Sequence, residues 1–221
     1  AHPNADRLSL TKVSDGAAIY DVVCGAHNIA QGDKVPLAKI GAVLPGNFKI
    51  KKSKIRGEVS EGMLCSVDEL QLDLVQDSDG ILQLPKNAEI GRDINAYLAL
   101  DDLILDVELT ANRGDLLSLR GLTTEIGAFL GKPFSLEGPK ELETGDWGFP
   151  VSIETDSCSF YTGLLIKGVQ VGPSPLWLQL RLLACGMRPV NNIVDIANLV
   201  MLEWGQPLHV FDADKLPGHE I

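Results

Sequence analysis

Over the first hundred residues, apolar and polar positions alternate in short runs that end at glycine-containing turns. These runs lie at residues 8–13, 19–24, 34–40, 48–55, 62–66 and 80–85. Alternation is typical of a strand with one buried face, and short strands separated by glycine turns favour a small closed barrel. We therefore predict that residues 1–98 form an all-β domain. Pro36 marks its strand as an edge or as a strand start.

The run at 48–55 changes its alternation partway along. Phe48 and Ile50 share a parity that Ile55 does not. One extra residue near Lys51 would restore a common inward face, so we predict a β-bulge there. The bulge would leave five cations mostly in solvent, namely Lys49, Lys51, Lys52, Lys54 and Arg56.

Residues 99–136 combine one strand pattern with one helix pattern. Residues 103–109 alternate, and apolar positions spaced three and four apart follow over 119–129. Asp115 is a candidate N-cap for this helix, and Gly131 is its stop. We predict a small α/β module here. Residues 137–150, which are rich in glycine and acidic residues, have the composition of a linker.

Residues 151–221 contain two well-marked helices. Ser174 is the candidate cap of the first helix, which ends at Gly186. The second runs from about residue 192 to 203 and ends at Gly205, and residues 208–212 have a strand pattern. This mixture predicts an α+β domain. The fold class is thus mixed β and α+β, in several domains.

The composition is that of a folded protein, and we expect no membrane span in it. Of the 221 residues, 45% are apolar and 22% are charged, and both fractions are ordinary for soluble domains. No run approaches the ~20 apolar residues of a membrane span. The four cysteines stand apart among apolar neighbours, which favours buried reduced thiols and a cytoplasmic location. The chain does not begin with Met, so we expect further sequence upstream.

Charge is distributed unevenly along the chain. The net charge of −11 argues against unspecific binding to a phosphate backbone. Residues 1–98, however, carry 11 basic and 13 acidic groups, so this part of the chain is nearly neutral. Its segment 49–56 contains five cations and no acidic residue. These cations are either a nucleic-acid-facing patch or a solvated strand face that prevents edge pairing. No metal-binding, nucleophile-elbow or P-loop motif occurs, so no metal site is predicted.

Three motifs in the first domain resemble a known RNA-binding fold. They are HPNADRL at 2–8, VCGA at 23–26 and SEGMLCS at 60–66. Together they resemble the OB-fold-like tRNA-binding barrel found in several aminoacyl-tRNA synthetases. The resemblance implies that residues 1–98 are such a barrel with its first strand missing.

Four later motifs narrow the resemblance. ELTANRGD at 108–115, PSPLWL at 173–178, GMRPVNNIVD at 186–195 and EWGQPLHVFD at 203–212 occur in that order. This order resembles the beta subunit of bacterial-type phenylalanyl-tRNA synthetase. The chain departs from the family pattern at His27, Ala111 and Trp204. Family members extend in both directions, so we expect an N-terminal fragment in which 151–221 is the start of a truncated editing domain of the B3/B4 type.

The resemblance implies a function shared with a partner subunit. The family binds tRNA(Phe) and hydrolyses tRNA mischarged with tyrosine, while ATP-dependent charging with phenylalanine resides mainly in the alpha subunit. The implied assembly is an α2β2 tetramer without membrane contact. The fragment is expected to bind no cofactor and to be inactive in aminoacylation. The complete enzyme uses ATP and magnesium.

Two residues align with polar positions of the family's editing pocket. They are Arg188, whose guanidinium suits phosphate and ribose, and His209, whose imidazole can position water or a terminal adenosine. Each also has a structural interpretation. A cation after a helix C-terminus is favoured by the helix dipole, and His209 could be a core residue that shares a face with Phe211.

Other polar clusters favour structural roles. Asn112, Arg113 and Asp115 suit a hydrogen-bond network that fixes a loop, and Asp195 and Asn198 lie three apart on a helix. Two alternatives to the editing function stay open. One is a stand-alone tRNA-binding module without catalysis, and the other is an interaction domain whose barrel contacts protein.

Overall fold

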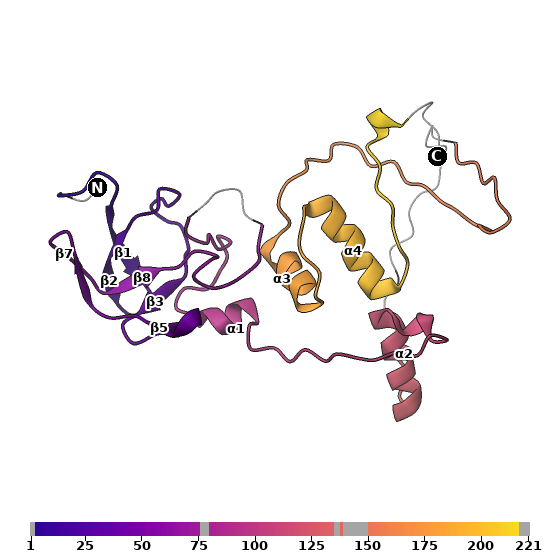
Figure 1. Ribbon diagram of the computed structural model, residues 1–221, viewed down its shortest axis with the longest axis horizontal. Helices are drawn as coiled ribbons and strands as arrows, with labels where there is room; N and C mark the ends of the chain where they lie inside the picture. Colours follow the sequence, from indigo (N-terminus) through magenta and orange to yellow (C-terminus); the bar gives the residue numbers. More distant parts are fainter. Residues whose placement is uncertain (1–2, 76–79, 135–137, 139–149, 217–221) are drawn as a thin grey trace. The chain divides into compact units, whose positions relative to one another are not determined.

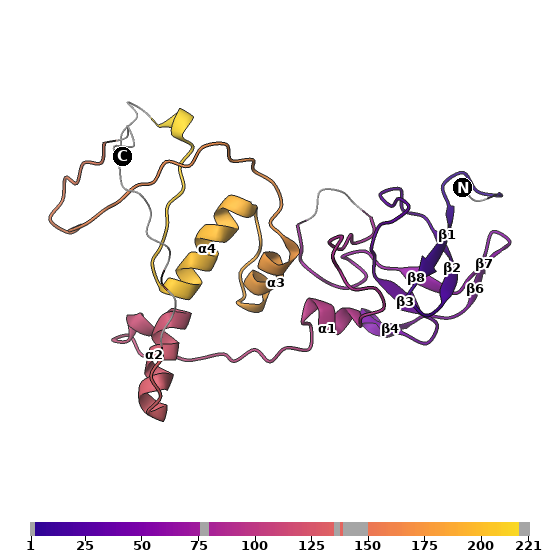
Figure 2. The same cartoon turned by 180° about the vertical axis from the view of Figure 1, so that it is seen from behind.

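Figure 1 shows the computed structural model of the chain, and Figure 2 shows it from behind. The structure describes residues 3–75, 80–134, 138 and 150–216. The chain divides into two compact units. The first unit contains residues 1–105 and 173–190, and the second contains 106–172 and 191–221. Apart from residues 138 and 150, the predicted linker lies outside the described residues.

The first unit is built from short antiparallel strand pairs. β1 (Ser9–Ser14) pairs with β2 (Ile19–Cys24), and β3 (Leu37–Lys39) pairs with β8 (Gly62–Leu64). β4 (Val43–Leu44) pairs with β5 (Phe48–Lys49) across the short helix η1 (Pro45–Asn47), and β6 (Ser53–Ile55) pairs with β7 (Glu58–Ser60). The prediction of short strands separated by turns is therefore confirmed, since these pairs carry the fold of residues 9–64.

A closed barrel is not seen among the described residues. The strand pairs form four separate two-stranded sheets, and the predicted closing strand contributes only bridges at Ile81 and Leu84. One physical reason is Pro36, which lacks an N–H for a ladder, so that β3 begins only at Leu37. The barrel stays a prediction from the resemblance.

The strand predicted over 48–55 is two strands. Ile50 exchanges hydrogen bonds with the β3–β4 turn, donating to Ala42 at 2.8 Å and accepting from Gly41 at 2.9 Å. Ile50 lies in the core, where it is 5% exposed, between the end of β5 at Lys49 and the start of β6 at Ser53. The break lies at the predicted place. The common inward face is wrong, however, because Phe48 is 57% exposed.

Helix α3 (Leu176–Ala184) belongs to the first unit, although the sequence analysis places it in the 151–221 domain. Leu176 and Leu180 pack against the buried cluster that contains Cys65, Leu82 and Leu98. Helix α1 (Ile94–Leu98) supplies Leu98, which is 1% exposed. The core of this unit therefore combines residues that are far apart in the sequence.

The second unit is built around two helices. α2 (Leu119–Leu130) follows the short helix η2 (Gly114–Leu116) and packs against α4 (Asn192–Trp204). Gly131 and Gly205 end these helices in the left-handed conformation, as predicted. The N-cap of α2 is Ser118 rather than Asp115, because η2 comes between them. A further short helix is η3 (Ala213–Lys215).

Two predicted strands are not formed. Residues 103–109 and 208–212 carry no strand or bridge, and Leu103 and Leu105 are 79% and 74% exposed. A strand exists only when a partner supplies its ladder of hydrogen bonds. No described residue pairs with either segment. Alternation alone therefore predicted an extended chain but not a sheet.

Candidate nucleic-acid interface and editing residues

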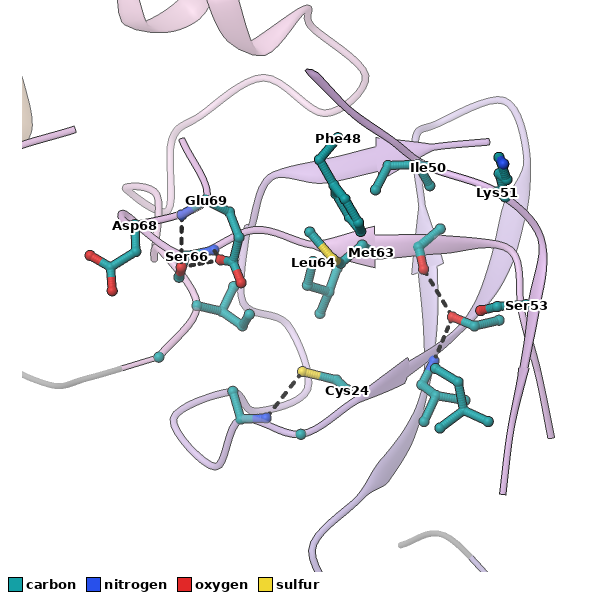
Figure 3. Close-up of a pocket in the computed structure, with 18 of the residues that line it drawn as sticks. Cys24, Phe48, Ile50, Lys51, Ser53, Met63, Leu64, Ser66, Asp68 and Glu69 are labelled. Carbon is teal, nitrogen blue, oxygen red and sulfur yellow. Dashed lines mark hydrogen bonds between the residues drawn. The ribbon is translucent and has the colours of Figure 1, made fainter. Parts of the chain in front are cut away.

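The first unit contains a cavity of about 1040 Å³, which Figure 3 shows in close-up. Its walls come from β2, β5, β6, β8 and the turn at 66–69. Met63 and Leu64 of β8 give it an apolar floor, and Phe48 and Ile50 lie above them in the same view. A hollow of this size with polar groups at its rim is large enough for a ligand.

Opposite charges mark the two ends of this cavity. Lys49 and Lys51 line the cavity, and so do Asp68 and Glu69. In Figure 3, Lys51 lies at the side away from the two acids. Glu69 is held in place, because its carboxylate accepts hydrogen bonds from the backbone N–H and the hydroxyl of Ser66. The cavity is therefore cationic at one end only.

The five predicted cations divide into one that is paired and four that are not. Lys52 Nζ lies 2.9 Å from Glu61 Oε1. Lys49, Lys51, Lys54 and Arg56 are all exposed and form no ion pair with any described residue. Their charges are thus available to a ligand, whereas that of Lys52 is partly neutralised within the protein.

Arg56 owes its position to a tight hairpin. It forms the turn between β6 and β7 together with Gly57, and their φ angles are 51° and 101°. Two positive φ values in a two-residue loop are those of a type I′ turn, which matches the twist of the flanking strands. The side chain of Arg56 is thereby presented at the tip of the hairpin.

Arg188 lies just after α3 and is exposed. Its Nε is 3.3 Å from Asp73 Oδ2, and the two side chains are 77% and 62% exposed. Exposed pairs of this kind contribute ~0–1 kcal/mol, so the guanidinium can exchange this partner for a ligand. The contact places Arg188 in the first unit.

His209 lies in the second unit, in an exposed segment after α4. Its ring stacks on Phe211, with centroids 6.4 Å apart and an interplanar angle of 30°. The interpretation of His209 as a core residue is wrong, although the contact with Phe211 is present. Arg188 and His209 belong to different units, so their convergence on one pocket stays a prediction.

The polar loop at 112–115 is held together by Arg113. Its guanidinium contacts Asp115 at 2.9 and 3.0 Å and Glu125 of α2 at 2.9 and 3.3 Å. Asp115 first, and then Glu125, hold the pKa of Arg113 above its usual range, and Arg113 in turn lowers the pKa of both carboxyls. The loop-fixing role is supported, with Glu125 in the place expected for Asn112.

Phe48 is the site residue that the sequence analysis missed. Its parity placed it with the core, but it lines the cavity and is 57% exposed. The available signal was its position one residue before the cation cluster. Aromatic side chains beside lysines are the pattern of surfaces that stack nucleic-acid bases.

Among residues 3–75, 80–134, 138 and 150–216, no group of three or more His, Cys, Asp or Glu is arranged to hold a metal ion. In the same part of the chain, no helix has the length and apolar character needed to cross a membrane.

Comparison with family models gives two matches. Residues 1–93 match a tRNA binding domain, and residues 157–221 match a B3/4 domain. The first match covers most of the first unit, including the cavity and the cation cluster. The chain is thus of the class that combines a tRNA-binding domain with a B3/4 domain, in a fold of mixed strands and helices.

Curated relatives are similar over the whole chain. Phenylalanine–tRNA ligase beta subunits from Geobacter sulfurreducens, Hahella chejuensis and Bacillus cereus are 50%, 49% and 46% identical to it. The alignments cover 100%, 97% and 100% of this chain and 28%, 27% and 28% of the relatives. The chain belongs to the family of phenylalanine–tRNA ligase beta subunits, as its motifs predicted. It spans a little more than a quarter of the length of these relatives.

Proposed function

We propose that the chain contributes tRNA contact and part of a proofreading site to a phenylalanine–tRNA ligase. The partners would be an alpha subunit, in an α2β2 assembly, and tRNA(Phe). The observation that carries the proposal is the identity of about one half to named beta subunits over the whole chain. The cation cluster on the cavity adds a surface with the charge that RNA requires.

The tRNA contact would be made by the four cations without an intramolecular ion pair among the described residues. Lys49, Lys51, Lys54 and Arg56 lie within eight residues, on β5, on the segment that joins β5 to β6, on β6 and at the hairpin tip. Each phosphate that they neutralise would release counterions, so binding would weaken as salt rises. The negative net charge of the whole chain would confine RNA to this surface.

The proofreading role follows from the chemistry of the two amino acids. Tyrosine differs from phenylalanine by one hydroxyl, and an apolar synthetic pocket cannot strongly reject an added hydroxyl. A second site that hydrogen-bonds this hydroxyl discriminates more strongly, because phenylalanine leaves its polar groups unpaired. Arg188 would bind the 3′ end of the tRNA, and His209 would orient water or the terminal adenosine.

Charging would take place mainly in the alpha subunit, with ATP and magnesium, in the cytoplasm. This chain alone would therefore be inactive in aminoacylation. Phenylalanine-dependent exchange of pyrophosphate into ATP by the chain alone would overturn this part of the proposal.

The editing residues are tested in the complete α2β2 enzyme. His209→Ala and Arg188→Ala are expected to leave Phe-tRNA formation intact and to slow hydrolysis of Tyr-tRNA(Phe), by about a hundredfold for the histidine if it is a general catalyst. Arg181→Ala is the matched control, since Arg181 is an exposed arginine of the same segment. Unchanged hydrolysis in both variants would favour a tRNA-binding module without catalysis.

A further inference from the structure

We propose that the cavity of the first unit binds an unpaired nucleotide of RNA, with its base stacked on Phe48 and its phosphates against Lys49 and Lys51. The inference rests on the proposed tRNA contact and adds the form of RNA that the site takes. It predicts that this surface recognises single-stranded nucleotides rather than a double helix.

The exposure of Phe48 favours a stacked base. Its ring is 57% exposed although neighbouring Ile50 is 5% exposed, and it belongs to a strand of only two residues. An apolar ring that lines a hollow has a large unburied surface, and a nucleobase has a flat face that can cover it. Stacking on aromatic side chains accepts any base, because every base has such a face.

Two lysines lie on the same cavity as this ring. Lys49 directly follows Phe48, and both Lys49 and Lys51 line the same cavity without an ion pair to any described residue. Aromatic side chains beside a cationic groove are the usual arrangement for single-stranded nucleic acid. Lys52, between Lys51 and Ser53, is instead paired with Glu61 and points its charge elsewhere.

The acidic residues of the cavity disfavour a duplex. Asp68 and Glu69 line the cavity as well, and Figure 3 shows them on the side away from Lys51. A double helix carries phosphates on two strands, so it would bring one backbone towards these carboxylates, where like charges repel. A single strand needs only one cationic edge. The polarity of the cavity therefore favours unpaired nucleotides.

The size of the cavity agrees with this occupant. Its volume of about 1040 Å³ lies just above the ~300–1,000 Å³ found for small-molecule sites. It has room for a nucleotide and its neighbours along the RNA strand. The stacking itself requires only the face of the Phe48 ring.

The test is the affinity of the 221-residue chain for a labelled eight-nucleotide single-stranded RNA and for a duplex of the same sequence, measured by fluorescence anisotropy. We expect the single strand to bind more tightly. Phe48→Leu should weaken its binding about tenfold, and Phe48→Trp should retain it. Val43→Ala is the matched control, because Val43 is an equally exposed apolar residue of the adjacent strand and does not line the cavity.

A salt titration separates this inference from the proposed tRNA contact. Lys51→Ala should reduce the salt slope by about one unit, while Phe48→Leu should lower affinity without changing the slope. If tRNA binds with a slope that depends on Lys51 and Phe48→Leu has no effect, the tRNA contact stands and the stacking site is wrong. Equal affinity for the duplex would also overturn the stacking site. Absence of all RNA binding would overturn both.

Discussion

Gln179 and Val75 exchange two hydrogen bonds although 104 positions separate them in the sequence. The Val75 N–H donates to Gln179 Oε1 at 2.6 Å, and Gln179 Nε2 donates to the Val75 carbonyl at 2.8 Å and to the Ser174 carbonyl at 2.8 Å. The side-chain amide of Gln179 thus satisfies both backbone polar groups of Val75, as a neighbouring strand does in a sheet. Gln179 is 4% exposed; its bond to the Ser174 carbonyl is buried, and its two bonds to Val75 are half-buried.

Gln179→Leu is expected to destabilise the chain by roughly 2–3 kcal/mol, because it leaves the N–H and carbonyl of Val75 without their partner. Urea unfolding followed by circular dichroism measures the change. Arg181→Ala, an exposed position on the same helix, should leave the midpoint nearly unchanged. Equal midpoints for the two variants would show that the amide contributes nothing.

Gly121 of α2 is predicted to resist substitution by alanine. A Cβ at this position would lie 1.8 Å from the carbonyl oxygen of Asp115, so the helix and the loop would have to separate. Alanine is favoured over glycine in helices by ~1 kcal/mol, but the clash should outweigh this and give a net loss of ~1–3 kcal/mol. The measurement is the thermal midpoint. In the same segment, Gly114→Ala meets no atom within 4 Å and serves as the control.

The Asp15 carboxylate makes the stability of the fold depend on pH in the acidic range. It accepts hydrogen bonds from Lys39, from the backbone N–H groups of Ala18 and Ala17, and from the Tyr20 hydroxyl. Lys39 is the largest cause that holds the pKa of Asp15 well below its usual range. A carboxyl whose pKa is lowered by folding stabilises the fold at every pH above its pKa in the unfolded chain, which is ~3.9 for Asp. This contribution is lost as the pH falls through the pKa that Asp15 has in the folded chain.

Asp15→Asn should therefore lower the thermal midpoint at pH 7 and flatten its decline between about pH 5 and pH 2. Asp101→Asn is the control, since Asp101 is exposed and has no hydrogen bond or ion pair to a described residue. Parallel acid limbs for Asp15→Asn and the parent chain would contradict the assignment.

The four free cysteines should react in order of their exposure. Cys185 is exposed and Cys158 is half-buried, so the prediction of buried thiols is wrong for these two and confirmed for Cys24 and Cys65. Burial raises the pKa of Cys65 to about 11, which keeps it protonated at pH 8. Alkylation at pH 8, read by mass spectrometry of peptides, should label Cys185 first and Cys65 only after unfolding. Early labelling of Cys65 would contradict this order, and Cys185→Ser should remove the fast phase.

Local signals predicted the helices better than the sheets. Gly131 and Gly205 end α2 and α4 because glycine adopts the left-handed conformation at low cost, and this property is readable from sequence. Pairing of strands is not local. Residues 103–109 have the alternation of a strand, yet nothing in their sequence could show whether a partner lies beside them.

The candidate site was predicted in the same uneven way. The cation cluster was visible because charge and exposure go together, whereas the pairing of Lys52 with Glu61 required the hairpin to form. Phe48 was misplaced because parity assumes one continuous strand, whereas β5 ends at Lys49 and β6 begins only at Ser53. Arg188 and His209 could be named only through the family resemblance.

The packing of α3 has a practical consequence for dissecting this protein. The first unit is discontinuous, since its second piece enters from residues 173–190 after the chain has passed through residues 106–172. Truncation after residue 105 would remove Leu176 and Leu180 and so expose the apolar surface that they cover. It would also remove Gln179 and leave the backbone polar groups of Val75 without their hydrogen-bond partner. The first unit therefore cannot be excised as a single stretch of sequence without opening its own core.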